Sequence, residues 1–154
     1  MNTSALATTH LTVSCIGAGR LGTTLCRLLV EQQSAIRISI GQVLNNSLES
    51  SLKAVEFIGD GSVAKDSARL EPADMWLIST PDDAIQEVSE ALAQSGILAP
   101  GNIIFHCSGS LSSKVIRLPD NQCYRASVHP THSFANPEKS ISRFPGSSCA
   151  VEGD

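Results

Sequence analysis

The sequence lacks the features that mark several large protein classes. It contains no run of about 18 apolar residues, the length that a membrane-spanning helix needs. It has no cluster of Lys and Arg that could follow a phosphate backbone, and its formal net charge is −4. Its first ten residues carry neither a basic segment nor a long apolar stretch, so they do not resemble a signal peptide. We therefore expect neither a membrane nor a nucleic acid as a partner.

The cysteines also lack a recognisable pairing pattern. No C-x-x-C pair is present, and the five cysteines are widely spaced and odd in number. This pattern is typical of reduced thiols that serve as small apolar side chains, and it predicts a cytoplasmic protein. A G-x-S-x-G motif is missing as well, which leaves a serine hydrolase poorly supported.

What the sequence does contain is enough apolar material for one folded domain. Of its 154 residues, 42% are apolar and 17% are charged, a globular composition. We expect residues 1–10 to form a flexible N-terminal tail and residues 11–154 to form the domain. Short apolar runs predict strands at residues 11–16, 36–44, 62–64, 75–79, 103–106, 123–128 and 148–151. Helical spacing or capping residues predict helices at residues 20–32, 48–57, 81–94 and 113–117.

The alternation of these elements predicts the fold class. Strands that are continuous apolar runs and alternate with helices indicate an α/β domain with a doubly wound, mainly parallel sheet. Such domains bind ligands beyond the carboxyl ends of their strands, at the point where the strand order reverses. The unusual polar residues of this chain lie in the loops that follow five predicted strands, namely residues 17–22, 45–47, 79–83, 107–110 and 129–132.

The first of these loops has the pattern of a phosphate-binding turn. In VSCIGAGRLG, Gly17, Gly19 and Gly22 match G-x-G-x-x-G between a predicted strand and a predicted helix. The first glycine allows a tight turn, the second lets the backbone approach a pyrophosphate, and the third lets the helix pack on the strand. A glycine-rich turn without a ligand is the alternative.

The second loop is informative because it lacks an acid. Sites for NAD place Asp or Glu after the second strand, where it binds the ribose hydroxyls, but no acid occurs from Gln33 to Leu48. The strand ends instead in Asn45, Asn46 and Ser47, which would not repel a 2′-phosphate, and Arg20 supplies a nearby cation. We therefore predict NADP rather than NAD. These residues can equally end the strand and cap the next helix.

The third loop, STPDD, is expected both to line the nucleotide crevice and to begin the next helix. Ser79 and Thr80 are expected to line the nucleotide crevice. Thr80 is expected to be the N-cap of the following helix, with Pro81 as its first residue. We expect Asp82 and Asp83 to be helix-capping acids rather than catalytic ones.

The fourth and fifth loops carry the candidate catalytic residues. Ser108 and Ser110 flank Gly109 and could contact a nicotinamide ribose or a substrate, although a plain turn would look the same. His129 follows a strand at the ligand-binding edge and can exchange protons near neutral pH, although a structural histidine is the alternative. His132 is a weaker candidate. The His and Cys residues of this region fit no familiar zinc spacing, so no metal is expected.

The order of these motifs resembles that of a known family. IGAGRLG, LNNSLES, DMWLISTPDDAI, APGNIIFHCSGSLSS, SVHPTHSF and FPGSSCAVEGD follow one another as in the N-terminal Rossmann-like domain of a bacterial family of predicted NADP-dependent oxidoreductases. That family is related to 6-phosphogluconate, pyrroline-5-carboxylate and prephenate dehydrogenases. The resemblance covers about residues 11–154, and it is the combined order that is specific.

The resemblance implies roles for individual residues. It places the pyrophosphate on Gly17, Ala18, Gly19, Arg20, Leu21 and Gly22, and the adenosine 2′ position beside Asn45, Asn46 and Ser47. Thr80 and Pro81 would flank the dinucleotide, Ser108 and Gly109 would lie near the nicotinamide, and His129 would sit by the hydride-transfer site. Relatives often have Asn-Arg-Ser after the second strand, whereas this chain has Asn46 in place of the arginine.

The resemblance also implies a larger protein and a function. Such proteins continue into an all-helical C-terminal domain that closes the substrate site and forms a homodimer, and this chain ends before it. The predicted function is that of an NADP-dependent oxidoreductase acting on an unidentified small metabolite, with His129 as proton donor or acceptor and Ser108 positioning the substrate. The alternative is a non-catalytic module that binds or senses a dinucleotide. A methyltransferase ranks third, because its ribose site normally needs an acid after the second strand.

Overall fold

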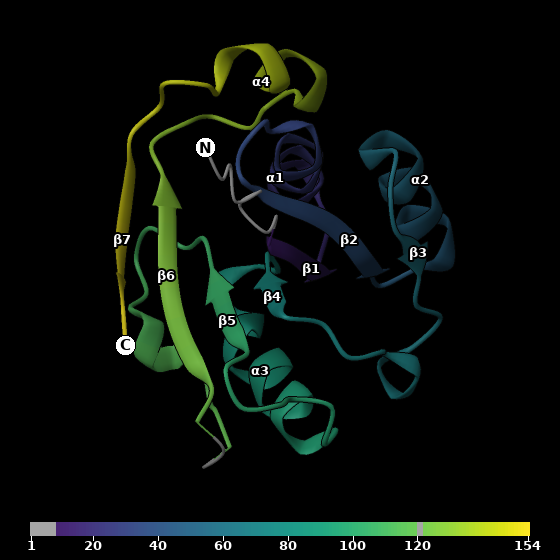
Figure 1. The fold of residues 1–154 in the computed structure, drawn as a ribbon, viewed down its shortest axis with the longest axis vertical. Coiled ribbons are helices and arrows are strands. Elements are labelled where there is room, and N and C mark those ends of the chain that lie inside the picture. The colour runs from purple at the N-terminus through teal and green to yellow at the C-terminus, as the bar shows by residue number, and fades with distance from the viewer. Residues whose placement is uncertain (1–8, 120–121) are drawn as a thin grey trace, which may run out of the picture.

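Seven strands form one sheet in the order β3-β2-β1-β4-β5-β6-β7, in a computed structural model that describes residues 9–119 and 122–154 (Figure 1). The strands are β1 (Thr9–Ile16), β2 (Ile36–Leu44), β3 (Ser62–Val63), β4 (Met75–Ile78), β5 (Ile103–His106), β6 (Tyr124–Pro130) and β7 (Cys149–Gly153). Strands β1 to β6 are parallel, and β7 pairs antiparallel with β6. The predicted α/β class with a mainly parallel sheet is confirmed.

Helices connect these strands and cover the sheet. They are α1 (Arg20–Glu31), α2 (Leu48–Ile58), α3 (Ile85–Gln94) and α4 (Pro137–Arg143), with 3-10 turns at Ser67–Arg69, Asp82–Ala84 and Ser113–Val115. Figure 1 shows α4 beside α1, at the end of the molecule to which β6 points. Within the described ranges, no helix combines the length and the apolar character that a membrane crossing requires.

The core has two clusters, one on each face of the sheet. Because successive side chains of a strand point to opposite faces, Leu77 of β4 packs with residues of α1 and α2, whereas Trp76 and Ile78 pack with Ile85 of α3. Trp76 and Ile78 are fully buried. Both faces of β4 are therefore covered, which explains why its sequence is an unbroken apolar run.

Helix α2 has the ends that its sequence predicts. The Ser47 hydroxyl accepts a hydrogen bond from the Ser50 amide at 3.1 Å, so Ser47 is the N-cap. Gly59 ends the helix in the left-handed conformation, with φ of +78°.

Helix α3 begins later than predicted, and Thr80 does not cap it. Pro81 has an extended conformation with ψ of 151°, so it cannot be the first residue of a helix. A 3-10 turn over Asp82–Ala84 follows, and α3 begins at Ile85 without a side-chain cap from any described residue. The predicted helix-capping role of Asp82 is therefore wrong. Its carboxylate bonds elsewhere, as described below.

Other boundaries also differ from the sequence expectations. Strand β1 begins at Thr9, so residues 9 and 10 belong to the sheet, and the rest of the predicted tail lies outside the described residues. Helix α4 was not predicted, because its seven residues are too few to show an apolar period. Asn136 caps it, its side-chain oxygen accepting from the Lys139 amide at 2.9 Å, and Pro137 is its first residue.

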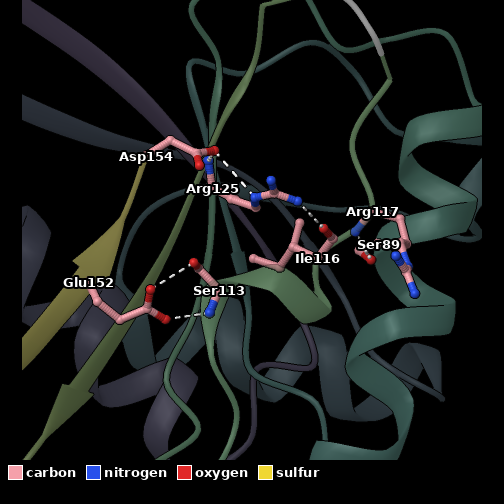
Figure 2. A network of polar contacts seen from close by, with 7 residues as sticks. All are labelled: Ser89, Ser113, Ile116, Arg117, Arg125, Glu152 and Asp154. Carbon is pink, nitrogen blue, oxygen red and sulfur yellow. Dashed lines mark hydrogen bonds and ion pairs between the residues drawn. The ribbon is translucent and has the colours of Figure 1, made fainter.

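Two carboxylates attach β7 to the rest of the domain (Figure 2). Glu152 accepts hydrogen bonds from the backbone amide and the hydroxyl of Ser113, which begins a 3-10 turn. Asp154 lies 3.3 Å from the Nε atom of Arg125 on β6, and Arg125 also donates to the Ile116 carbonyl. These contacts fix an edge strand whose five residues are all exposed.

Candidate functional site

Three loops meet at the point where the strand order reverses. Within the sheet, β2 and β3 lie on one side of β1, and β4 to β7 lie on the other side. The Gly17 amide donates to the Leu44 carbonyl at 2.8 Å, which joins the ends of β1 and β2. The Ser79 hydroxyl donates to the Gly17 carbonyl at 2.8 Å, which joins the ends of β1 and β4. The loops after β1, β2 and β4 are thus held together by their own hydrogen bonds.

A cleft of about 920 Å³ opens over these three loops. The lining residues are Gly17, Ala18, Gly19, Arg20, Leu21, Asn45, Asn46, Ser50, Ser79, Thr80, Pro81, Ala84, Val88, Ser133, Phe134 and Ala135. They contain no carboxylate, and Arg20 is the charged residue among them. The cleft therefore suits an anionic ligand.

The three glycines of the first loop have three different reasons to be glycine. Gly17 has φ of +83°, and a Cβ atom there would lie 2.7 Å from the Thr80 amide nitrogen. A Cβ atom on Gly22 would collide with the Ser79 hydroxyl and lie 3.3 Å from the Cys15 sulfur. Gly19 has an ordinary extended conformation, with φ of −78°, and a Cβ atom there would have no described atom within 4 Å. Gly17 and Gly22 serve the fold, whereas Gly19 faces open space at the cleft.

The beginning of α1 adds partial positive charge to the cleft. Gly19 is the N-cap residue, no described side chain caps this end, and the first turn contains no acid. The first amides of a helix have no partner within the helix, and the helix dipole makes this end positive. Such an end binds phosphate groups readily.

Two buried polar atoms at the cleft have no hydrogen-bond partner among the described residues. They are the Oδ1 atom of Asn45 and the Oγ1 atom of Thr80. The backbone amide of Asn45 donates to the Ser51 hydroxyl at 3.0 Å, which holds the residue in place. Since buried polar atoms in folded proteins are nearly always bonded, two such atoms at one cleft point to a ligand or water there.

Ser108 is engaged within its own loop. Its hydroxyl donates to Asp82 at 2.8 Å, the Ser110 hydroxyl donates to the same carboxylate oxygen at 2.7 Å, and the Ser110 and Leu111 amides donate to the Ser108 hydroxyl. The hydrogen bonds from Ser110 and then Ser108 hold the pKa of Asp82 below its usual range. Asp82 therefore holds the loop after β5 against the loop after β4.

His129 lies within β6 rather than after it. It pairs with Ala150 of β7, and its side chain is exposed. Its Nδ1 atom lies 3.3 Å from the Cys107 carbonyl, which can only accept, so Nδ1 carries the hydrogen and Nε2 keeps its lone pair. A Cβ atom on Gly109 would lie 2.6 Å from the His129 ring. Gly109 is thus the residue that lets the ring pack against this loop.

The structure separates the predicted site residues into two groups. Those of the loops after β1, β2 and β4 line the cleft, except Gly22 and Ser47, which pack α1 and cap α2. Ser108, Gly109 and His129 lie together where β5 and β6 end, and they are not among the residues that line the cleft. Burial raises the pKa of the neighbouring Cys107 thiol to about 12, so this cysteine is no nucleophile.

The cleft also contains residues that the sequence analysis missed. Ser133, Phe134 and Ala135 reach it from the segment between β6 and α4, and Arg20 donates to the Ala135 carbonyl at 3.4 Å. The Phe134 ring packs against His132, with centroids 4.9 Å apart. Ser50, Ala84 and Val88 complete the set. Only the proximity of Ser133 to the HPTH motif could have indicated this segment.

No three His, Cys, Asp or Glu side chains of the described residues are arranged to hold a metal ion.

A doubly wound sheet with a glycine-lined cleft at its switch point defines the class of Rossmann-type domains. The chain belongs to the Rossmann-like domain family, whose model matches residues 1–130. No curated protein sequence matches it.

Several solved structures share this fold. A candidate NADP oxidoreductase from Bacteroides fragilis has a TM-score of 0.76 at 21% identity, over 94% of this chain and 52% of that one. Prephenate dehydrogenase from A. aeolicus, solved with hydroxyphenyl propionate and NAD+, has a TM-score of 0.70 at 19% identity. The match covers 96% of this chain and 51% of that one. The 1-pyrroline-5-carboxylate reductase of Streptococcus pyogenes has a TM-score of 0.65 at 16% identity. The match covers 94% of this chain and 49% of that one.

These comparisons confirm the family resemblance at the level of the domain. The chain resembles the NAD(P)-binding domains of oxidoreductases, and it spans about half the length of the solved structures that it matches. Identities of 16% to 21% establish a shared fold and leave the activity to be argued from the site. The helical C-terminal domain and the homodimer stay predictions.

Proposed function

We propose that this chain is the NADP-binding domain of a cytoplasmic oxidoreductase that acts on a small metabolite. The observation that carries the proposal is Gly19. Its backbone conformation suits any residue and its missing side chain leaves open space, so nothing in the described packing requires glycine there. A ligand that must approach the backbone closely does require it.

The residues present fit a dinucleotide. The amides at the start of α1 and the backbone of Gly17 and Gly19 would hold the pyrophosphate. Asn45 and Thr80, with their unpartnered oxygen atoms, would bond the sugars. The lack of a carboxylate in the cleft lining favours NADP over NAD, because an acid there would repel a 2′-phosphate. When bound, the nicotinamide would supply the hydride chemistry.

The chain's own residues would orient the reactants and move the proton. His129 is exposed, and the hydrogen bond from Nδ1 to Cys107 leaves Nε2 able to accept a proton from a substrate or, once protonated, to return it. Asp82 fixes the loop that carries Ser108 and Gly109, and Gly109 supports the His129 ring. In this proposal Ser108 acts by positioning the substrate beside His129.

The first test is a calorimetric titration of the chain with NADPH and with NADH. We expect saturable binding of NADPH, weaker binding of NADH, and a loss of at least about 100-fold in Gly19→Asp, whose carboxylate would meet the pyrophosphate. Asp is also a good N-cap, so the melting temperature of Gly19→Asp should stay the same or rise. The control variant Gln33→Asp adds the same charge beyond the C-terminal end of α1. It should bind NADPH with the affinity of the wild type.

A second experiment, on the His129→Ala variant, distinguishes a catalyst from a module that only senses the dinucleotide. His129→Ala should bind NADPH as the wild type does, and it should lose turnover in a screen of carbonyl and imine compounds that follows NADPH oxidation. Retained turnover would remove His129 from the mechanism. Failure of the folded wild-type chain to bind either dinucleotide would contradict the proposal itself.

A further inference from the structure

His106 is a buried imidazole to which the proposed function assigns no task. It is the last residue of β5, it is fully buried, and both of its ring nitrogens have hydrogen-bond partners. Nδ1 accepts the Ser108 amide at 3.1 Å, and Nε2 lies 3.2 Å from the Ser112 carbonyl. Because an amide can only donate and a carbonyl can only accept, these contacts require the neutral tautomer that carries its hydrogen on Nε2.

The Ser108 amide and the Cys107 carbonyl belong to one peptide group. That peptide is trans, so its N–H and its C=O point in opposite directions. The N–H meets Nδ1 of His106, and the C=O accepts from Nδ1 of His129 at 3.3 Å. One peptide group is therefore held between two imidazole rings, one of them buried and the other exposed.

A second peptide group continues this arrangement on the other side of His106. The Ser112 carbonyl, which accepts from Nε2, shares its peptide with the Ser113 amide, and that amide donates to the Glu152 carboxylate (Figure 2). The Ser113 hydroxyl donates to the same carboxylate at 2.9 Å. The hydrogen bonds from the Ser113 amide and then its hydroxyl hold the pKa of Glu152 below its usual range, so Glu152 is the anionic end of the arrangement.

All hydrogen bonds in this series run in the same direction. Starting at His129, each group donates to the next one, and the last acceptor is Glu152. We refer to the series as the His129–Glu152 chain. Its members are His129, the Cys107–Ser108 peptide, His106, the Ser112–Ser113 peptide and Glu152. Hydrogen bonds aligned in this way polarise one another, so each one strengthens its neighbours.

The His129–Glu152 chain determines which nitrogen of His129 is free. A neutral imidazole can carry its hydrogen on either nitrogen, and the hydrogen bond of one nitrogen selects the tautomer. Here the Cys107 carbonyl takes the Nδ1 hydrogen, which leaves the lone pair on Nε2. The ring also packs closely on the same turn, because a Cβ atom on Gly109 would lie 2.6 Å from it. A catalytic base needs a third group that orients it in this way.

We propose that His106 is the positioning residue of His129. It holds the Cys107–Ser108 peptide so that the Cys107 carbonyl meets Nδ1 of His129, and Glu152 anchors His106 through the Ser112–Ser113 peptide. Because His106 is fully buried, it acts through the peptide and not on a ligand. The inference rests on the proposed function, because it explains how the proposed catalytic histidine keeps Nε2 able to accept a proton.

Two substitutions of His106 separate positioning from packing. The side-chain oxygen of Asn takes the place of Nδ1 and can accept the Ser108 amide, whereas the side-chain amide of Gln reaches the place of Nε2 and can donate to the Ser112 carbonyl. Each variant keeps one of the two contacts, so we expect similar losses of melting temperature. His106→Gln should lose the Nδ1–H form of His129 as the predominant tautomer, and His106→Asn should keep it.

The tautomer is measured by nitrogen NMR of the imidazole rings, at a pH where the rings are neutral. His129→Ala assigns the signals of His129. This measurement needs neither a substrate nor a dinucleotide, so it tests the positioning of His129 directly.

Turnover of NADPH with a substrate from the carbonyl and imine screen is the second readout. His106→Gln should lower kcat at least about tenfold and change KM for NADPH less than about twofold, whereas His106→Asn should keep most of the wild-type kcat. Glu152→Gln removes the charge but keeps an acceptor for the Ser113 amide, and it should lower kcat about two- to fourfold. Asp154→Asn is the matched control, because Asp154 also attaches β7 but lies outside the chain of hydrogen bonds. It should leave kcat unchanged.

The outcomes separate the inference from the proposed function. A wild-type chain in which His129 is predominantly the Nε2–H form would overturn the inference, as would two His106 variants that both keep or both lose the Nδ1–H form. An equal fall of kcat in Asp154→Asn and Glu152→Gln would overturn the part assigned to Glu152. In these cases dinucleotide binding stands. If the folded wild-type chain binds neither dinucleotide, or if His129→Ala retains turnover, the proposed function fails and the inference fails with it.

Discussion

At the scale of single residues, neighbouring glycines of one motif have unrelated tasks. Gly17 is required by a left-handed backbone next to Thr80, and Gly22 by the close approach of α1 to Ser79, which follows β4, and to Cys15 of β1. Of the three, Gly19 alone is free of such constraints. We therefore attribute the need for glycine at this position to a ligand that approaches the backbone. The sequence motif marks all three equally, and only their surroundings tell them apart.

This contrast predicts a difference in stability. Gly22→Ala forces a methyl group against Ser79 and Cys15, and we expect it to lower the free energy of unfolding by about 1–3 kcal/mol. Gly19→Ala is the matched control. Its poorer N-cap is offset by about 0.4–1 kcal/mol of lost chain entropy in the unfolded state, so its stability should be close to that of the wild type. Urea denaturation measures both. Equal losses in the two variants would contradict this account of the motif.

At the scale of elements, the ends of β4 and β5 are joined by one carboxylate. Asp82 accepts from Ser108 and Ser110, and Ser108 in turn accepts two backbone amides of its loop. His106, fully buried at the end of β5, accepts the Ser108 amide at Nδ1 and bonds the Ser112 carbonyl through Nε2. The loop that carries Ser108 is therefore held from both sides.

The Asp82 contacts predict a pH-dependent contribution to stability. The hydroxyl donors hold the pKa of Asp82 below its ordinary value of 3.8, so the folded state favours the ionised carboxylate. The contribution is present above that ordinary value and is lost as the pH falls through the lowered pKa of the folded state. Asp82→Asn should thus lower the melting temperature at about pH 7, and the gap to the wild type should narrow toward about pH 3.

Asp83→Asn is the control for this comparison, because no hydrogen bond from the serine loop to Asp83 is described. It should change the melting temperature little at either pH. A gap between Asp82→Asn and the wild type that stays constant down to about pH 3 would show that the charge of Asp82 is not what the loop depends on.

At the scale of the whole molecule, the two core clusters share one sheet and should unfold together. Trp76, the single tryptophan, is fully buried at the centre of that sheet, so its fluorescence reports unfolding of the entire domain. Proteins of this size usually lose such a sheet in one cooperative transition.

The cleft couples this transition to the ligand. If the chain binds NADPH as proposed, a concentration of about 100 times the dissociation constant should stabilise it by about 2.7 kcal/mol. For a domain of this length, that corresponds to a rise in melting temperature of roughly 5–10 °C. Trp76 fluorescence or calorimetry measures the shift, and Gly19→Asp should show none. A shift of the same size in Gly19→Asp would place the ligand outside the cleft.

The sequence predicted the parts of the site that are local in the chain. Each strand end and the polar loop after it lie within a few residues, so the loops after β1, β2 and β4 could be assigned to one edge of the sheet. The helix start at Thr80 was wrong because Pro81 is compatible with an extended as well as a helical backbone. Its extended ψ leaves the Thr80 hydroxyl at the cleft instead of on α3.

By itself the sequence determined the class of sheet, the place of the glycine loop and the lack of an acid after β2, because periodicity and glycine spacing are local properties. The tertiary structure decided which distant residues meet. Arg20 reaches Ala135 across 115 positions, Ser108 reaches Asp82 across 26, and Arg20 and Lys53 line one groove. Such contacts follow from the order in which strands pair and the angle at which helices cover them. No pattern confined to one stretch of chain carries that information.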